Sequence, residues 1–154
     1  MDEIRTELYL HAIFIVDAHK KLIVPKLQDK IYKLIEEAIE RLNCSVLAIG
    51  GTENHVHLLF DLNPDISTEE LLKTVKLSTQ TKIRHSLNPS FFWEDGYYVY
   101  SIGSEDIEAE KHKIKQEAIK HQNLTLAEEL QKLRDELQMN ETDDLTDINE
   151  NNFN

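Results

Sequence analysis

The sequence predicts an α+β protein in which helices cover one antiparallel sheet. Apolar runs rich in β-branched and aromatic residues alternate with segments of helical periodicity. Their order is strand, helix, strand, strand, helix, strand, helix, which is a split β-α-β-β-α-β unit of the ferredoxin-like or RRM-like kind with an added C-terminal helix. A chain of 154 residues, 40% of them hydrophobic, is long enough for one domain with a substantial core.

The first strand is predicted over residues 8–16, where Leu-Tyr-Leu-His-Ala-Ile-Phe-Ile-Val is almost continuously apolar. Such a run is typical of a central strand that is buried on both faces. His11 lies inside it, and we expect a buried, hydrogen-bonded histidine there rather than a ligand. A helix then begins at Pro25, shows apolar residues at helical spacing, and can end at Asn43.

A hairpin and a capped helix follow. Residues 45–49 and the strand that begins at His55 are joined by a glycine-rich turn, which favours antiparallel pairing. Ser67 and Glu70 form a capping-box pattern. The sequence therefore predicts a second helix from this cap to about His85.

The remaining elements are less sharply bounded. Residues 91–101 are rich in aromatic rings and are predicted to form the fourth strand, with most rings in core and cross-strand packing. Acids followed by lysines suit the dipole of a third helix over residues 105–122. A further helix over 126–137 leads into an acidic, asparagine-rich end. We expect a domain over residues 1–138 and a disordered tail over 139–154.

Composition limits the class of protein. The single cysteine, Cys44, excludes an internal disulfide framework and a metal site made of cysteines alone. The sequence has no apolar run of membrane-spanning length, and its first residues do not form a secretory signal. We therefore expect a soluble, cytoplasmic protein with no membrane partner. The formal net charge of −12 argues against unspecific binding to nucleic acid.

The main candidate for chemistry is the pattern His55-Val56-His57 on a predicted strand. Residues two apart on a strand share a face, so the two imidazoles can offer two nitrogens to one divalent cation. An isolated pattern of this kind is more often a pair of ordinary histidines. Context has to decide between the two interpretations.

One basic surface stands out from the acidic chain. The second predicted helix carries four cations and no acid between Lys73 and His85, namely Lys73, Lys76, Lys82 and Arg84. Four cations over three turns also occur on ordinary solvated helix faces, and phosphate binding is the more specific alternative. Both interpretations stay open.

Taken together, the motifs resemble the single-tyrosine HUH transposases of the IS200-like type, including their REP-associated relatives. The resemblance extends from about Leu8 to Leu130. Four segments carry it: His11-Ala12-Ile13-Phe14 is similar to the family's first strand, Asn54-His55-Val56-His57-Leu58-Leu59 to its HUH strand, Trp93-Glu94-Asp95-Gly96-Tyr97 to its Trp-Gln-x-Gly-Tyr turn, and Thr125-Leu126-Ala127-Glu128-Glu129 to the segment after its catalytic helix.

This resemblance implies metal-assisted cleavage and joining of single-stranded DNA. In the family a tyrosine attacks a phosphodiester and becomes linked to the 5′ phosphate, while a divalent metal polarises the phosphate. The resemblance implies His55, His57 and Glu117 as the metal ligands, with Mg²⁺ or Mn²⁺ as the metal. The implied partners are single-stranded or hairpin DNA, with the four cations of the second helix as candidate contacts, and a second copy of the chain in a homodimer.

The sequence departs from the family at the nucleophile. The family's third helix carries Tyr-x-x-x-Gln, and the aligned positions are Lys113 and Glu117. Glutamate can bind Mg²⁺ or Mn²⁺. Lysine cannot act as the tyrosine does, because its amine is protonated at neutral pH. His112 is adjacent but points about 100° away around the helix. We therefore expect the strand-transfer reaction to be lost.

Three functions remain open from the sequence. The chain could still cut and join DNA through another nucleophile. It could be a recruited protein that binds DNA hairpins, or represses, without cleavage. It could also be a dimeric, metal-binding remnant of the fold with a partner other than nucleic acid. A covalent-adduct assay separates the first function from the second, and a salt-dependent gel shift separates both from the third.

Overall fold

The computed structural model describes residues 2–16, 20–117 and 125–150, and the side chains of 139–150 are not described. The chain divides into two compact units, Met1–Ala118 and Ile119–Asn154, and each is described by itself. The division after residue 138 that the sequence suggests lies within the second unit, and it stays a prediction.

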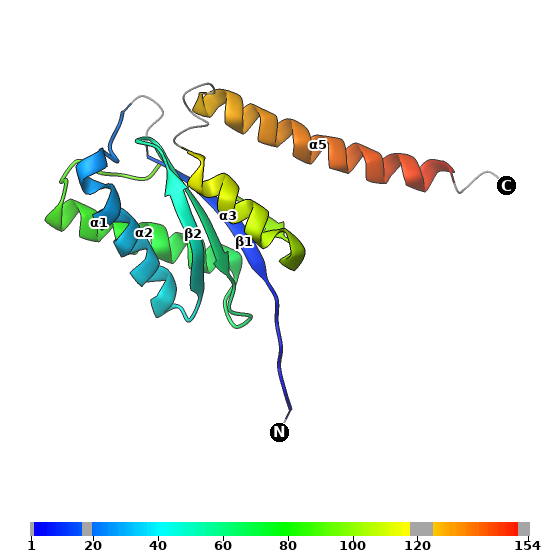
Figure 1. Ribbon diagram of the computed structural model, residues 1–154, viewed down its shortest axis with the longest axis horizontal. Coiled ribbons are helices and arrows are strands. Elements are labelled where there is room, and N and C mark those ends of the chain that lie inside the picture. The colour runs from blue at the N-terminus through cyan, green and yellow to red at the C-terminus, as the bar shows by residue number, and fades with distance from the viewer. Residues whose placement is uncertain (1, 17–19, 118–124, 151–154) are drawn as a thin grey trace. The chain divides into compact units, whose positions relative to one another are not determined.

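The elements of the first unit follow the predicted order (Figure 1). They are β1 (Tyr9–Ile15), α1 (Pro25–Arg41), β2 (Ser45–Gly51), β3 (His55–Asp61), α2 (Thr68–Ser86), β4 (Tyr98–Ile102), the 3-10 turn η1 (Ser104–Asp106) and α3 (Ile107–Lys115). The four strands form one antiparallel sheet in the order β2-β3-β1-β4. The predicted fold class, a split β-α-β-β-α-β sheet, is therefore confirmed.

The residues predicted to begin and end the first two helices do so in the structure. Pro25 is the first residue of α1. Asn43, with a φ of 57°, adopts the left-handed conformation just beyond that helix, where asparagine is well tolerated. The Ser67 side chain accepts a hydrogen bond of 3.1 Å from the Glu70 main-chain N–H and so caps α2.

The fourth strand is shorter than predicted. β4 begins only at Tyr98, and the segment before it is held by side-chain and isolated main-chain hydrogen bonds instead of a strand ladder. The Trp93 main-chain N–H donates to Gln80 Oε1 at 2.8 Å, and the Glu94 N–H donates to the Ile15 carbonyl at 2.7 Å. The Trp93 ring packs edge-on against the ring of Phe14, so its predicted place in the core is confirmed.

The third helix is also shorter than predicted, because α3 ends at Lys115 rather than at residue 122. The main-chain N–H of Gln116 is shared between the carbonyls of His112 and Lys113, at 3.1 and 3.2 Å. A shared donor of this kind is common at helix ends. No glycine, asparagine or proline marks this stop in the sequence, so the helical pattern gave no warning of it. Residues 118–124 lie outside the described part of the chain.

The second unit contains the added C-terminal helix, α5 (Leu126–Glu150). The Thr125 side chain accepts a hydrogen bond of 3.3 Å from the Glu128 main-chain N–H at its start. The helix continues past residue 137, where the sequence predicts its end. Residues 151–154 lie outside the described part, and the disorder of the tail stays a prediction.

Both faces of the sheet are covered within the first unit. The main core lies between one face and helices α1 and α2, and β3 contributes Val56, Leu58 and Phe60 to it. α3 covers the opposite face, where Ile114 packs with Ala48 and Leu59 (Figure 1). β3 is therefore buried on both sides, and any polar side chain on its α3 face lies in the interior.

None of the helices among the described residues combines the length and the apolar character that crossing a membrane requires.

Candidate metal centre

His55 and His57 lie on the face of β3 that α3 covers. The alternation predicted from the sequence holds, because Val56 and Leu58 point into the opposite core. His55 is 0% exposed and His57 is 3% exposed. The two imidazole rings meet edge-on, with their centroids 5.0 Å apart. The predicted pair thus forms one buried, rigidly placed set of nitrogens.

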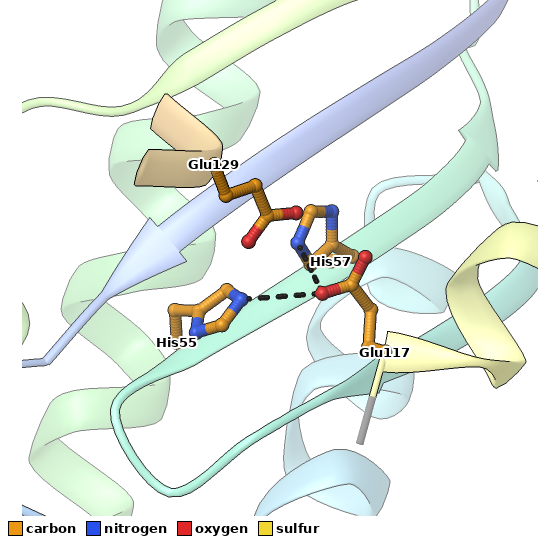
Figure 2. A group of neighbouring side chains, drawn as sticks. All are labelled: His55, His57, Glu117 and Glu129. Carbon is orange, nitrogen blue, oxygen red and sulfur yellow. Dashed lines mark ion pairs between the residues drawn. The ribbon is translucent and has the colours of Figure 1, made fainter. Parts of the chain in front are cut away.

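Glu117 lies two residues beyond the end of α3 and points toward the two histidines (Figure 2). Its Oε2 atom lies 3.5 Å from His55 Nε2 and 3.2 Å from His57 Nε2. Glu117 is itself only 2% exposed. The structure therefore brings together the three residues that the family resemblance suggests as ligands. Glu129, which Figure 2 also draws, is a residue of the second unit.

The close seat of α3 on the sheet depends on Gly50. This residue is paired with His57 across β2 and β3. A Cβ atom at position 50 would lie 2.5 Å from the Ile114 main-chain oxygen. Because glycine has no side chain, the last turn of α3 can rest directly on β2. Glu117 follows Ile114 by three residues, so this contact sets the height of its carboxylate above the histidine pair.

A third buried histidine contacts His57 through the ring nitrogen that faces away from Glu117. His11, on β1, places its Nε2 atom 2.7 Å from His57 Nδ1. Its Nδ1 atom lies 2.8 Å from Glu110 Oε2 and 2.8 Å from the Tyr100 hydroxyl. His11 is 3% exposed. The prediction that His11 is a buried, hydrogen-bonded histidine is therefore confirmed.

The protonation of this pair follows from its surroundings. Burial lowers the pKa of His11 below 6.5, although the hydrogen bond with Glu110 acts in the opposite direction. The hydrogen bond from His11 is the main cause that lowers the pKa of Glu110 below 4.5. At neutral pH the pair is consequently a neutral imidazole that donates to an ionised carboxylate.

His55 is held by the turn that precedes β3. Its Nδ1 atom lies 2.8 Å from Asn54 Oδ1 and 2.9 Å from Thr52 Oγ1. The Thr52 hydroxyl also donates to Asn54 Oδ1 at 2.9 Å. An Nδ1–H on His55 satisfies these oxygens and leaves its Nε2 lone pair on the side of Glu117.

His55, His57 and Glu117 together fit a divalent metal. Each offers one donor atom, and these atoms lie within 4.8 Å of one another. Two donors bound about 2.1–2.3 Å from one ion, at angles near 90–110°, are roughly 3.0–3.8 Å apart. The separations of 3.2 and 3.5 Å between Glu117 Oε2 and the two histidine Nε2 atoms lie in that range. Two imidazole nitrogens and a carboxylate oxygen suit several divalent cations.

Comparison with known proteins identifies the family. A family model described as "Transposase IS200 like" matches residues 4–117, which is most of the chain. The chain belongs to the IS200-like transposase family. The resemblance inferred from the sequence motifs is thus confirmed, and the divalent metal that the family uses agrees with the donor set of the site. No protein among those of curated function matches the sequence.

Solved structures of transposases share the fold of this family member. One is a protein of Deinococcus radiodurans R1 named as a candidate transposase, with a TM-score of 0.60 and 15% identity over 73% of this chain and 94% of that chain. Another is a REP-associated tyrosine transposase bound to a REP hairpin, with a TM-score of 0.59 and 13% identity over 79% of this chain and 74% of that chain.

Lys113, the residue predicted from the sequence at the position of the family's tyrosine, is exposed and pairs with Glu110. Its side chain is 70% exposed, and its Nζ atom lies 3.3 Å from Glu110 Oε1. His112, its neighbour, is exposed. Neither side chain is among the groups that the structure gathers at the candidate metal centre of this transposase family member.

The four cations of α2 are not equally available for phosphate. The Lys76 ammonium donates to the main-chain oxygens of Glu94, at 2.6 Å, and of Gly96. Burial lowers the pKa of Lys76. Arg84 donates from Nε to the Phe91 oxygen at 2.5 Å. These two residues anchor the 91–96 segment, which the basic pattern alone did not reveal.

Of the other two cations, Lys73 is exposed, whereas Lys82 is half-buried, as Lys76 is. The Lys73 ammonium pairs with Glu69 Oε1 at 2.6 Å on the exposed surface of α2. Glu69 lies just before residues 73–85, the stretch that contains no acidic residue. Lys82 is partly exposed. Contact of any of the four with DNA stays a prediction.

Sequence reasoning missed Glu110. It lies four residues before Ile114, so the two share the buried side of α3. The signal available in the sequence was an acid four residues before an isoleucine of the predicted buried stripe, which places that acid on the buried face of the helix. The partner that makes it acceptable, His11, lies 99 residues away in sequence, and only the fold brings them together.

Proposed function

We propose that this member of the IS200-like transposase family binds a divalent metal and structured single-stranded DNA but does not cleave the DNA. The observation that carries the proposal is the juxtaposition of His55, His57 and Glu117 with a lysine, Lys113, at the position of the family's tyrosine. The metal-binding part of the family machinery is retained, whereas the covalent part lacks its nucleophile.

The metal half of the proposal rests on donor chemistry. The three residues would hold one Mg²⁺ or Mn²⁺ ion, which when bound would polarise a phosphate oxygen. His57→Ala and Glu117→Ala should each abolish measurable Mn²⁺ binding in calorimetry, since each removes one of three protein ligands. His112→Ala is the matched control, because this exposed histidine on α3 lies outside the ligand set. Unchanged Mn²⁺ affinity in His57→Ala would show that the site is wrongly placed.

The absence of cleavage follows from the chemistry of the candidate nucleophiles. A lysine ammonium has no free lone pair at neutral pH, and the exposed side chain of Lys113 pairs with Glu110. The Tyr100 hydroxyl bonds to His11 Nδ1, and the rings of His11 and His57 both lie between it and the metal-binding nitrogens. Neither residue is placed to attack a phosphate bound at the centre.

The decisive experiment restores the family's residues. Incubation with hairpin-bearing single-stranded DNA and Mn²⁺ should give no covalent adduct with the unmodified protein. Lys113→Tyr, alone and with Glu117→Gln, should give an adduct if the missing nucleophile is the only defect. An adduct formed by the unmodified protein would overturn the proposal and point to another nucleophile.

DNA binding is proposed through the basic face of α2. Each phosphate contact by a lysine releases counterions, so affinity should fall steeply as salt is added. Lys73→Gln and Lys82→Gln are the informative variants, because Lys76 and Arg84 also anchor the 91–96 segment. Each should reduce the salt dependence of binding by about one unit of slope. If the unmodified protein shows no salt-sensitive binding, a partner other than nucleic acid becomes the better explanation.

We also propose that the protein is a homodimer, as the family resemblance implies. β2 and β4 are the two edges of the sheet, and an edge strand offers unpaired main-chain groups to a second copy. Sedimentation at high micromolar concentration should give the mass of two chains. A single-chain mass under those conditions would exclude the dimer.

A further inference from the structure

The candidate metal centre continues outward through a line of buried hydrogen bonds. His57 Nδ1 meets His11 Nε2 at 2.7 Å, and His11 Nδ1 meets Glu110 Oε2 at 2.8 Å. The other carboxylate oxygen of Glu110 faces the ammonium of Lys113 at 3.3 Å. Three separate elements, β3, β1 and α3, contribute to this line.

The carboxylate at the far end fixes the direction of every hydrogen bond in the line. An ionised carboxylate can only accept, so His11 Nδ1 must carry the proton that it donates to Glu110. The contact of 2.7 Å between the two rings places Nε2 of a neutral His11 against His57 Nδ1, so this Nε2 is the acceptor. His57 must therefore donate from Nδ1, and a neutral His57 then has no proton on Nε2, the atom that faces Glu117 Oε2 at 3.2 Å.

We propose that Glu110 and His11 are positioning residues of the metal centre, which together hold His57 in the tautomer that presents a bare Nε2 to the ion. This role rests on the proposed metal binding and extends it to two residues that do not touch the metal. It assigns a task to the buried acid of α3 and to the buried histidine of β1.

Glu110 is needed because a second group competes for the same atom. The Tyr100 hydroxyl also lies 2.8 Å from His11 Nδ1, and a hydroxyl can either donate or accept. Without the carboxylate, Tyr100 can donate to a bare Nδ1, and the proton of His11 then moves to Nε2. His57 Nδ1 becomes an acceptor, and its Nε2 carries a proton that blocks metal binding. The carboxylate thus decides between two hydrogen-bonded states of the same three side chains.

The tautomer can be read directly in the metal-free protein by nitrogen NMR of the imidazole side chains. The full-length unmodified protein should show a proton on Nδ1 of both His57 and His11. Glu110→Ala should move the His57 proton to Nε2 in a substantial fraction of molecules. Glu110→Gln should preserve the original tautomer, since its amide oxygen can still accept from His11.

Mn²⁺ affinity should follow the tautomer. Glu110→Ala should weaken binding of Mn²⁺ alone by about 10–100-fold in calorimetry, the range typical of lost outer partners of a metal-binding histidine. Glu110→Gln should stay close to the unmodified protein. Glu108→Ala is the matched control on the same helix, because Glu108 has an exposed pairing with Lys111 at 3.2 Å and no part in the line.

Clear results would overturn the role of Glu110 and His11. An unprotonated His57 Nδ1 in the unmodified protein would do so, whether or not any variant folds. So would a folded Glu110→Ala protein that keeps both the tautomer and the Mn²⁺ affinity. The predicted tautomers without any Mn²⁺ binding would instead refute the proposed metal-binding function and leave the positioning of His57 established.

Discussion

Substituting Gly50 by alanine tests the seat of α3 on the sheet and the height of Glu117 above the histidines. The added Cβ would lie 2.5 Å from the Ile114 main-chain oxygen and 3.1 Å from Ile114 Cγ2. Main-chain atoms cannot rotate away as a flexible side chain can. The last turn of α3 therefore has to move by roughly half an ångström or more, as in other overpacked interiors.

This displacement should lower the free energy of unfolding by about 1–3 kcal/mol, the usual effect of one extra carbon in a filled interior. This value is a net effect. Alanine has less conformational freedom than glycine in the unfolded chain, which stabilises the folded state by about 0.4–1 kcal/mol and offsets part of the strain. Because Glu117 follows Ile114 by three residues, its carboxylate moves with the turn. We expect Mn²⁺ affinity to fall by about 10-fold, the lower end of the effect of disturbing a ligand's support.

Chemical denaturation and Mn²⁺ calorimetry measure the two effects. Gly103→Ala is the matched control, since a Cβ there would meet its nearest atom, Glu105 Cδ, at an ordinary 3.4 Å. The free energy of unfolding of the control should change by less than about 0.5 kcal/mol. If Gly50→Ala were as stable as the control and bound Mn²⁺ equally well, α3 could not rest on β2 as described.

Three further outcomes are expected. Burial raises the pKa of Tyr32 to about 12, so between pH 10 and 12 the unfolded chain binds fewer protons than the folded one. The free energy of unfolding, obtained by denaturation at successive pH values, should therefore fall as the pH rises through this range. It should fall less steeply in Tyr32→Phe. Lys76→Met should lower the free energy of unfolding in urea denaturation by about 1–3 kcal/mol, because it removes the donor to two main-chain oxygens. Lys73→Met breaks only an exposed ion pair and should leave this free energy almost unchanged. The Cys44 thiol, buried and with a raised pKa, should react with a thiol reagent only as fast as the protein opens, and faster labelling in native buffer would contradict its burial.

The sequence predicts the fold well because its strongest signals are local. The period-two pattern around His55, the cap at Ser67 and the proline at position 25 each act within a few residues. Each of these elements begins in the structure where the pattern places it. Local signals of this kind depend on main-chain geometry, which does not need the rest of the fold.

The candidate site was predictable only in part. His55 and His57 are visible as a pattern, and Glu117 through a family alignment. The role of Glu110 depends on His11, which becomes its neighbour only when β1 enters the sheet beneath α3. The early end of α3 depends on a shared main-chain hydrogen bond at Gln116 and on no residue type. Long-range contacts and unmarked helix ends carry no local pattern, so sequence periodicity cannot reveal them.

The central place of β1 in the sheet has a consequence for the order of folding. The strand begins near the start of the chain, yet Tyr9 pairs with Asp61 on one side and with Ile102 on the other. The β2–β3 hairpin closes a short loop and can form early, whereas β1 must close two long ones. On the ribosome β1 cannot complete its pairing until β4 has emerged. The two histidines of β3 are therefore adjacent from the first folding steps, whereas the contact with His11 requires the long-range pairing of β1 with β3.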